Sequence, residues 1–235
     1  MTEIKPEVSD VKKEQTELPR SSTADVHAVD GANGKFEEVA KDIEKQSTPT
    51  ETELAEALNE IMTAIYDCDE DDFSFEDFDF EDPELESLIE NFQEDKWEKL
   101  TYMERLQLCR SLSYYLADKL GIKPPPIVAP FVDEPYHCGY YNSSTNIIRV
   151  NVNLFNNSKE TLDTIAHETW HAYQHKCADR GESVKDVLYA YNFKYYITTS
   201  KDANGKTIGF NEYQSQLVEA EARAFANQIK EKVGY

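Results

Sequence analysis

The chain lacks the sequence features of an exported or membrane-inserted protein. Its 235 residues contain no run near the roughly 18 consecutive apolar residues that a membrane span needs, and the first residues form no apolar segment. The four cysteines, Cys68, Cys109, Cys138 and Cys177, lie far apart without CxxC spacing. We therefore expect a cytoplasmic protein in which these thiols stay reduced and have a structural role.

Positive charge is also scarce, and the shortage is local. The chain has 24 Lys and Arg against 46 Asp and Glu, a net charge of −22. Residues 1–50 hold 11 acids and 7 bases, residues 51–95 hold 19 acids and no base, and residues 96–235 hold 16 acids and 17 bases. Because no basic face is available to neutralise phosphates, direct nucleic-acid binding and adsorption to anionic lipid are disfavoured.

The composition divides the chain into three segments. Residues 1–50 are polar and aperiodic, which predicts a disordered tail. Residues 51–95 predict an acidic amphipathic helix over about 54–66, followed by an acidic linker rich in phenylalanine. Residues 96–235 are nearly neutral and long enough to form one compact domain with a buried core.

The linker, residues 67–82, interleaves Phe73, Phe75, Phe78 and Phe80 with carboxylates. Repulsion between like charges at this density favours a solvated linker. The alternative is a recognition segment whose phenylalanines enter apolar pockets while its acids meet a basic rim. The partner would be another protein or this chain's own domain, and the sequence leaves these interpretations open.

Helical and strand patterns alternate through the C-terminal domain. Thr101 and Glu104 fit a capping box at the start of a helix that Gly121 is placed to end. Residues 146–153 alternate apolar and polar side chains, which predicts a half-buried strand near a sheet edge. The other expected elements are helices over 84–99, 159–179, 184–196 and 216–232, a short strand over 127–132 and a hairpin turn at 202–205.

The strongest chemical motif is the HExxH sequence from His167 to His171. Residues four apart on a helix differ by about 40° in direction and about 6 Å in height, so both imidazoles project from one face and can bind one metal ion. Neutral imidazole suits zinc. The carboxylate of Glu168, one residue after the first ligand, is placed to take a proton from water as a general base.

A third protein ligand is needed if one zinc position is to stay open for water. His175 lies on the same helical stripe, but three ligands spread along about 12 Å of straight helix cannot reach one ion. A later helix offers Glu219 and Glu221. Glu219 shares a stripe with Ala222 and Ala226, which permit close helix packing, so we favour Glu219 and keep Glu221 as the alternative.

These motifs resemble those of zincin-like metallopeptidases of the gluzincin type. They are especially similar to the small cytoplasmic and phage-associated domains of the ImmA/IrrE family, whose second motif, Glu-x-x-Ala-x-x-Phe-Ala, is matched from Glu219 to Ala226. The resemblance implies an α+β fold with a backing helix, a small mixed sheet, an active-site helix and a ligand helix. It also implies that His167, His171 and Glu219 bind zinc and that Glu168 is the general base. The 47 residues between His171 and Glu219 depart from the family pattern.

The sequence thus predicts a zinc-dependent metalloendopeptidase that hydrolyses peptide bonds of an intracellular protein. The strand over 147–152 is a candidate for binding an extended substrate by β-addition, and Tyr173 and Tyr213 are candidate donors to the oxyanion. The alternative is a non-catalytic binding protein, in which the acidic segment over 67–82 engages a basic protein partner or mimics the charge of DNA.

Overall fold

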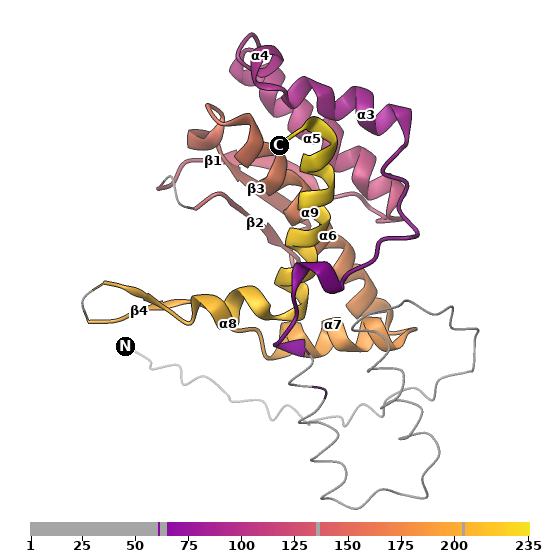
Figure 1. Cartoon of the computed structure of the whole chain (residues 1–235), viewed down its shortest axis with the longest axis vertical. Coiled ribbons are helices and arrows are strands. Elements are labelled where there is room, and N and C mark those ends of the chain that lie inside the picture. Colours follow the sequence, from indigo (N-terminus) through magenta and orange to yellow (C-terminus); the bar gives the residue numbers. More distant parts are fainter. Residues whose placement is uncertain (1–60, 62–64, 135–136, 204) are drawn as a thin grey trace, which may run out of the picture.

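The computed structural model describes residues 61, 65–134, 137–203 and 205–235 (Figure 1). The expected tail over 1–50 and most of the expected helix over 54–66 lie outside these residues. The described part has an α+β fold in which helices surround a small sheet. None of its helices is both long enough and apolar enough to cross a membrane. None of the four cysteines, all of which lie in the described part, forms a disulfide.

The helices follow the expected order along the chain, except that the helix expected over 84–99 is divided and that Phe210–Ser215 form a short helix that the sequence did not predict. The α-helices are α3 (Pro83–Ile89), α4 (Glu94–Trp97), α5 (Tyr102–Lys119), α6 (Ser158–Arg180), α7 (Val184–Lys194), α8 (Phe210–Ser215) and α9 (Leu217–Val233), and the 3-10 turns are η1 (Glu70–Asp72), η2 (Glu90–Phe92) and η3 (Val152–Leu154). The single helix expected over 84–99 is instead α3, η2 and α4. The backbone leaves the helical conformation at Gln93, so that Phe92 and Trp97 stack and both enter the core.

The main sheet has three strands in the order β1-β3-β2, where β1 spans Ile127–Phe131, β2 spans Gly139–Asn142 and β3 spans Ile147–Asn151. β3 pairs in parallel with β1 and antiparallel with β2. The predicted alternation in β3 is confirmed from Ile147 to Val150, where Ile148 and Val150 are buried, but it ends at Asn151, which is also buried. The prediction that this strand lies near a sheet edge is wrong, because parallel pairing with β1 covers its second side. The two edge strands are β1 and β2, and the sequence did not predict β2.

The long helix α6 organises the core. Asn157 caps its first turn, and Gly181 ends it with a positive φ of 64°. Its apolar face packs on α9, α7 and α5, and α9 runs alongside it (Figure 1). Ala222 and Ala226 of α9 are fully buried in the shared core, as their stripe predicted. The hairpin of β4 (Ser200–Lys201) and β5 (Thr207–Ile208) confirms the turn expected at 202–205.

The acidic segment, residues 67–82, packs three of its phenylalanines into this core. Phe75, Phe78 and Phe80 surround the ring of Phe225 at centroid distances of 5.1–5.6 Å, and Phe75 also meets Trp170 edge-on at 5.0 Å. The same buried cluster contains three residues that follow this segment along the chain, Leu85, Ile89 and Phe92. The interpretation of residues 67–82 as a solvated linker is therefore wrong, and the docking of its phenylalanines on the chain's own domain is what the structure shows.

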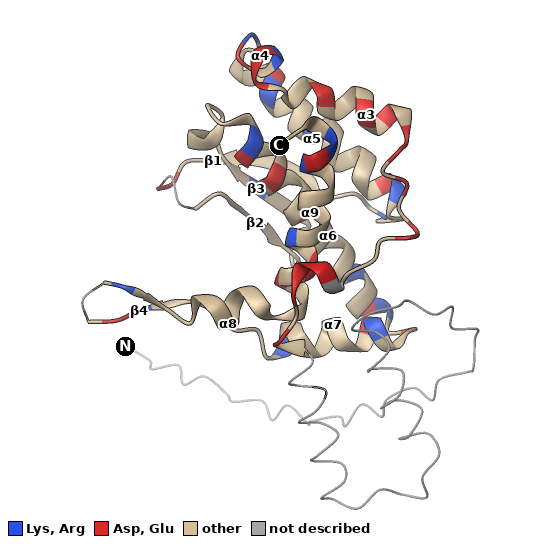
Figure 2. Ribbon diagram, in the orientation of Figure 1, with Lys and Arg blue, Asp and Glu red and all other residues tan. Residues whose placement is uncertain are grey.

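Around the packed phenylalanines, lysine and arginine side chains of the C-terminal domain form ion pairs with carboxylates of residues 67–82 (Figure 2). Glu70 pairs with Arg223 at 2.8 Å, Asp82 pairs with Lys119 at 2.7 Å, and Glu81 pairs with Lys232. Part of the negative charge that distinguishes the segment is thus neutralised within the molecule.

Candidate metal centre

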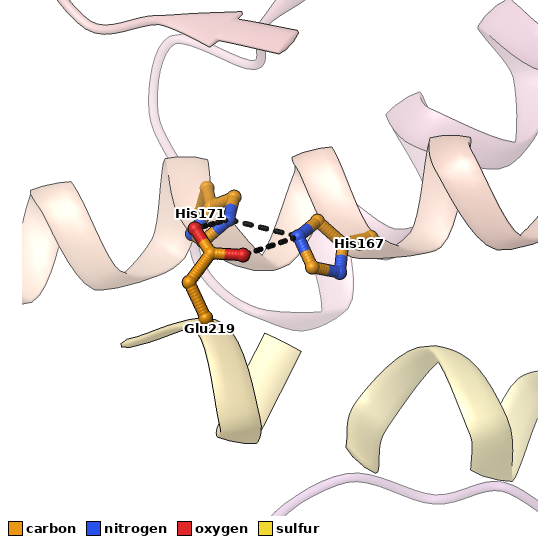
Figure 3. A group of neighbouring side chains, drawn as sticks. All are labelled: His167, His171 and Glu219. Atoms are coloured by element: carbon orange, nitrogen blue, oxygen red, sulfur yellow. Dashed lines mark hydrogen bonds and ion pairs between the residues drawn. The ribbon is translucent and has the colours of Figure 1, made fainter. Parts of the chain in front are cut away.

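Two helices bring three metal-ligating groups together. His167 and His171 project from one face of α6, and Glu219 faces them from the first turn of α9 (Figure 3). The two Nε2 atoms lie 3.0 Å apart, Glu219 Oε1 lies 3.2 Å from His171 Nε2, and Glu219 Oε2 lies 3.4 Å from His167 Nε2. The structure thus brings together the three residues that the sequence predicted as ligands.

These separations are compatible with one small ion held by all three residues. Donor atoms bound to zinc at about 2.0–2.1 Å with tetrahedral angles lie about 3.3 Å from one another. The two Nε2 atoms are 3.0 Å apart, and each has its own nearest oxygen of Glu219, so that one donor atom from each residue lies within 4.8 Å of the other two. Two imidazole nitrogens and one carboxylate also form one of the donor sets that catalytic zinc takes in proteins.

The electrostatics of the site favour a positive charge at its centre. Burial opposes the charge of Glu219, which is 2% exposed, but the two facing histidines hold its pKa well below the usual range. Burial by itself lowers the pKa of His171, yet the facing Glu219 carboxylate, with Glu168, raises it to about 9. A divalent cation placed between these groups would supply the same positive charge.

Buried amides fix the turn that delivers Glu219. The side chain of Gln216, which precedes α9 and is fully buried, donates to the carbonyls of Ile197 and Tyr213. The side chain of Asn192 in α7 accepts a hydrogen bond from the backbone N–H of Val218. Glu219 then lies in the first helical turn, where the helix dipole stabilises a negative charge.

Glu168 lies on the side of α6 that faces the sheet. Its side chain is 8% exposed, and its Oε2 accepts a 2.8 Å hydrogen bond from the backbone N–H of Tyr141 in β2. The expected general base is therefore held between α6 and the edge strand β2.

Other residues considered from the sequence lie elsewhere. Glu221 is fully buried between α9, α6 and α7 and accepts hydrogen bonds from Trp170, Gln174 and Tyr189. It is not part of the ligand group. His175 stacks on Phe193 with a centroid distance of 3.7 Å, in agreement with the argument that it cannot share the ion.

Of the two tyrosines predicted as oxyanion donors, Tyr213 lies at the site and Tyr173 lies in the core. Tyr213 donates a 2.8 Å hydrogen bond to Glu219 Oε2, whereas Tyr173 packs on Trp170 in the core. Tyr196, which the sequence analysis did not select, also donates to Glu219, through Oε1. Tyr196 had one indication in the sequence, its place in a tyrosine-rich stretch between His171 and Glu219. That stretch departs from the pattern of the family that the two motifs resemble.

Comparisons of the chain with protein-family models, with curated proteins and with solved structures gave no match. The geometry of the site is therefore the basis for its function.

Proposed function

We propose that the chain is a zinc-dependent metallopeptidase with a zincin-like fold of the gluzincin type, acting on peptide bonds of an intracellular protein. His167, His171 and Glu219 would hold the ion. The observation that carries the proposal is the approach of these three donor groups to 3.0–3.4 Å, directly beside Glu168 of the same HExxH motif. The sequence of a backing helix α5, a small mixed sheet, α6 and α9 agrees with the layout that the resemblance implies.

The chemistry divides between the ion and the side chains around it. Zinc, when bound, supplies a Lewis acid that polarises a substrate carbonyl and makes water a stronger acid. Glu168 accepts the proton of the attacking water and returns it to the leaving amine. The Tyr141 N–H holds one oxygen of Glu168 and so orients the carboxylate for this transfer. The hydroxyls of Tyr196 and Tyr213, which donate to Glu219 in the structure, are the candidate donors to the oxyanion.

The strand that binds the substrate in this proposal is β2. β3 has neighbours on both sides, and of the two edge strands β2 is the one that contacts Glu168. In an antiparallel pair, every second residue directs its N–H and C=O away from the partner strand. Tyr141 is such a residue, since its N–H reaches Glu168 instead of β3. An extended peptide added to the outer edge of β2 would therefore run past the general base.

The binding-protein alternative has less support. It requires the phenylalanines of residues 67–82 to be available to a partner, and Phe75, Phe78 and Phe80 are packed around Phe225. A basic partner for the exposed acids of this segment remains compatible with a peptidase.

A peptide library derived from a cell extract tests the function without a known substrate. The zinc-loaded full chain should create new N-termini, identified by mass spectrometry, and Glu168→Gln should lower their rate of formation by about 10²–10⁴-fold while it keeps its zinc. Equal cleavage by the two proteins, or a zinc-loaded wild type that cleaves nothing, would contradict the proposal.

A further inference from the structure

A buried chain of hydrogen bonds leads from the metal centre to α7. Nδ1 of His171 lies 2.8 Å from Oε1 of Gln174. Nε2 of Gln174 donates to Glu221 Oε2 at 2.9 Å and to the carbonyl of Val218 at 3.0 Å. Glu221 Oε1 in turn pairs with Lys185 Nζ at 2.6 Å. Both Gln174 and Glu221 are completely buried, so water does not substitute for these partners.

The direction of each hydrogen bond follows from the donors available. Trp170 and Tyr189 donate to Glu221 Oε2 at 3.0 and 2.5 Å, and Lys185 lies at the other oxygen, so Glu221 acts as an acceptor throughout. Gln174 must then turn its NH₂ group toward Glu221 and the Val218 carbonyl, which uses both of its N–H bonds. Its carbonyl oxygen is left facing His171.

A carbonyl oxygen only accepts, so Nδ1 of His171 must carry the proton in this contact. When the imidazole is neutral, its free lone pair is then on Nε2. Nε2 is the atom that faces His167 and Glu219. Metal-binding histidines depend on such partners for their orientation and basicity.

We propose that Gln174 and Glu221 are positioning residues that keep the proton of His171 on Nδ1 and direct its Nε2 to the metal centre. Lys185 and Tyr189 hold Glu221 in place, which links the affinity of the centre to the packing of α7 on α9. The effect on metal affinity rests on the proposed zinc binding, whereas the position of the proton is a property of the chain with or without the ion.

Substitutions at Gln174 and Glu221 test these hydrogen bonds. Gln174→Met keeps the size of the side chain without its hydrogen bonds and should weaken zinc binding by about 10–100-fold. Gln174→Glu places two carboxylates at a 2.9 Å contact and should weaken it at least as much. Glu221→Met removes the acceptor that holds the NH₂ group of Gln174 and should also weaken zinc binding.

The control is Thr161→Val, which removes buried hydrogen bonds of the same helix far from the ligands and should leave zinc affinity unchanged. The full chain is used throughout, with zinc affinity measured by competition with a chelator and folding by circular dichroism. If Gln174→Met or Glu221→Met folds and binds zinc as wild type does, the proposal is overturned.

Nuclear magnetic resonance of ¹⁵N-labelled histidine gives a readout that does not require zinc. The wild type should show a slowly exchanging Nδ1–H proton on His171, with or without zinc, and Gln174→Met should lose it. Protection that persists in Gln174→Met contradicts the positioning role. A wild type that binds no zinc but shows this proton contradicts the proposed function and supports the positioning role, so the two failures are distinguishable.

Discussion

The backbone N–H of Tyr141 donates a 2.8 Å hydrogen bond to Oε2 of Glu168. This contact joins the edge strand β2 to α6 at the residue proposed as general base. The position of Glu168 therefore depends on how closely β2 approaches α6, and that approach depends on Gly139. A Cβ atom at Gly139 would lie 2.6 Å from the carbonyl oxygen of Arg149 and 2.6 Å from Cγ2 of Thr164.

Gly139→Ala should displace β2 and disturb Glu168. The overlap with backbone and side-chain atoms predicts a loss of about 1–3 kcal/mol in the free energy of unfolding, measured by denaturant titration. Peptide cleavage should fall by more than the loss of folded protein explains, while zinc binding persists. Ser143→Ala, at an exposed position in the turn after β2, is the control. A Gly139→Ala protein with wild-type stability and cleavage would contradict the role given to this contact.

The tyrosines near α6 provide a second comparison. Tyr213→Phe removes a hydroxyl at the metal centre and should lower kcat by about 10²–10³-fold if that hydroxyl stabilises the oxyanion. Tyr173→Phe alters a ring packed on Trp170 and should leave kcat near the wild-type value. Steady-state kinetics on a peptide found in the library experiment would show the difference, and similar kcat values for both variants would exclude Tyr213 as the donor.

The phenylalanines of the acidic segment should contribute to stability. Phe78 is 7% exposed and packs on Phe80 and Phe225, so Phe78→Ala should lower the free energy of unfolding by about 3–5 kcal/mol. Glu76→Gln, at an exposed position two residues earlier, should change it by less than about 0.5 kcal/mol. Denaturant unfolding measures both. A negligible effect of Phe78→Ala would mean that the segment does not pack on the domain in solution.

Asp82 predicts a pH dependence of stability in the acid range. The hydrogen-bonded ion pair with Lys119, with further hydrogen bonds including one from the N–H of Glu84, lowers the pKa of Asp82 to about 2. Because the folded-state pKa lies below the unfolded value of about 3.9, the stabilisation is complete above that value and is lost as pH falls from about 4 toward 2.

Asp82→Asn keeps a capping side chain without the charge, so its stability should fall less than that of wild type over this range. Asp77→Asn, at an exposed position of the same segment, controls for the loss of one negative charge. Unfolding titrations at several pH values measure the difference. Parallel pH profiles for wild type and Asp82→Asn would show that the ion pair with Lys119 is not formed.

The sequence predicted the ligands because their arrangement depends on helical geometry alone. The four-residue spacing of His167 and His171 gives one face of α6, and the alanine stripe of α9 indicates which side of that helix meets α6. Both are local patterns. Gln174 and Tyr196 were missed because their roles arise from contacts with α9, 44–47 residues and 23 residues away respectively.

The wrong predictions about β2 and the acidic segment have the same origin, because they too concern contacts between residues far apart in the sequence. β2 has four residues without a period, and it exists because β3 and α6 hold it from two sides. The acidic segment was expected to be solvated because the count of charges opposes collapse. Burial of each phenylalanine stabilises the folded chain by about 1.5–3 kcal/mol. Solvent screens the repulsion between the exposed carboxylates, so burial of the phenylalanines outweighs that repulsion and the segment packs on the domain.

Metal analysis of the purified full chain and of Glu219→Ala tests the central claim most directly. The wild type, prepared without chelator, should contain about one zinc per chain. Glu219→Ala should lose nearly all of it, while Glu231→Gln, at an exposed position of the same helix and outside the ligand group, should keep it. A wild-type chain without zinc, or a Glu219→Ala protein that retains the ion at full stoichiometry, would contradict a centre formed by His167, His171 and Glu219.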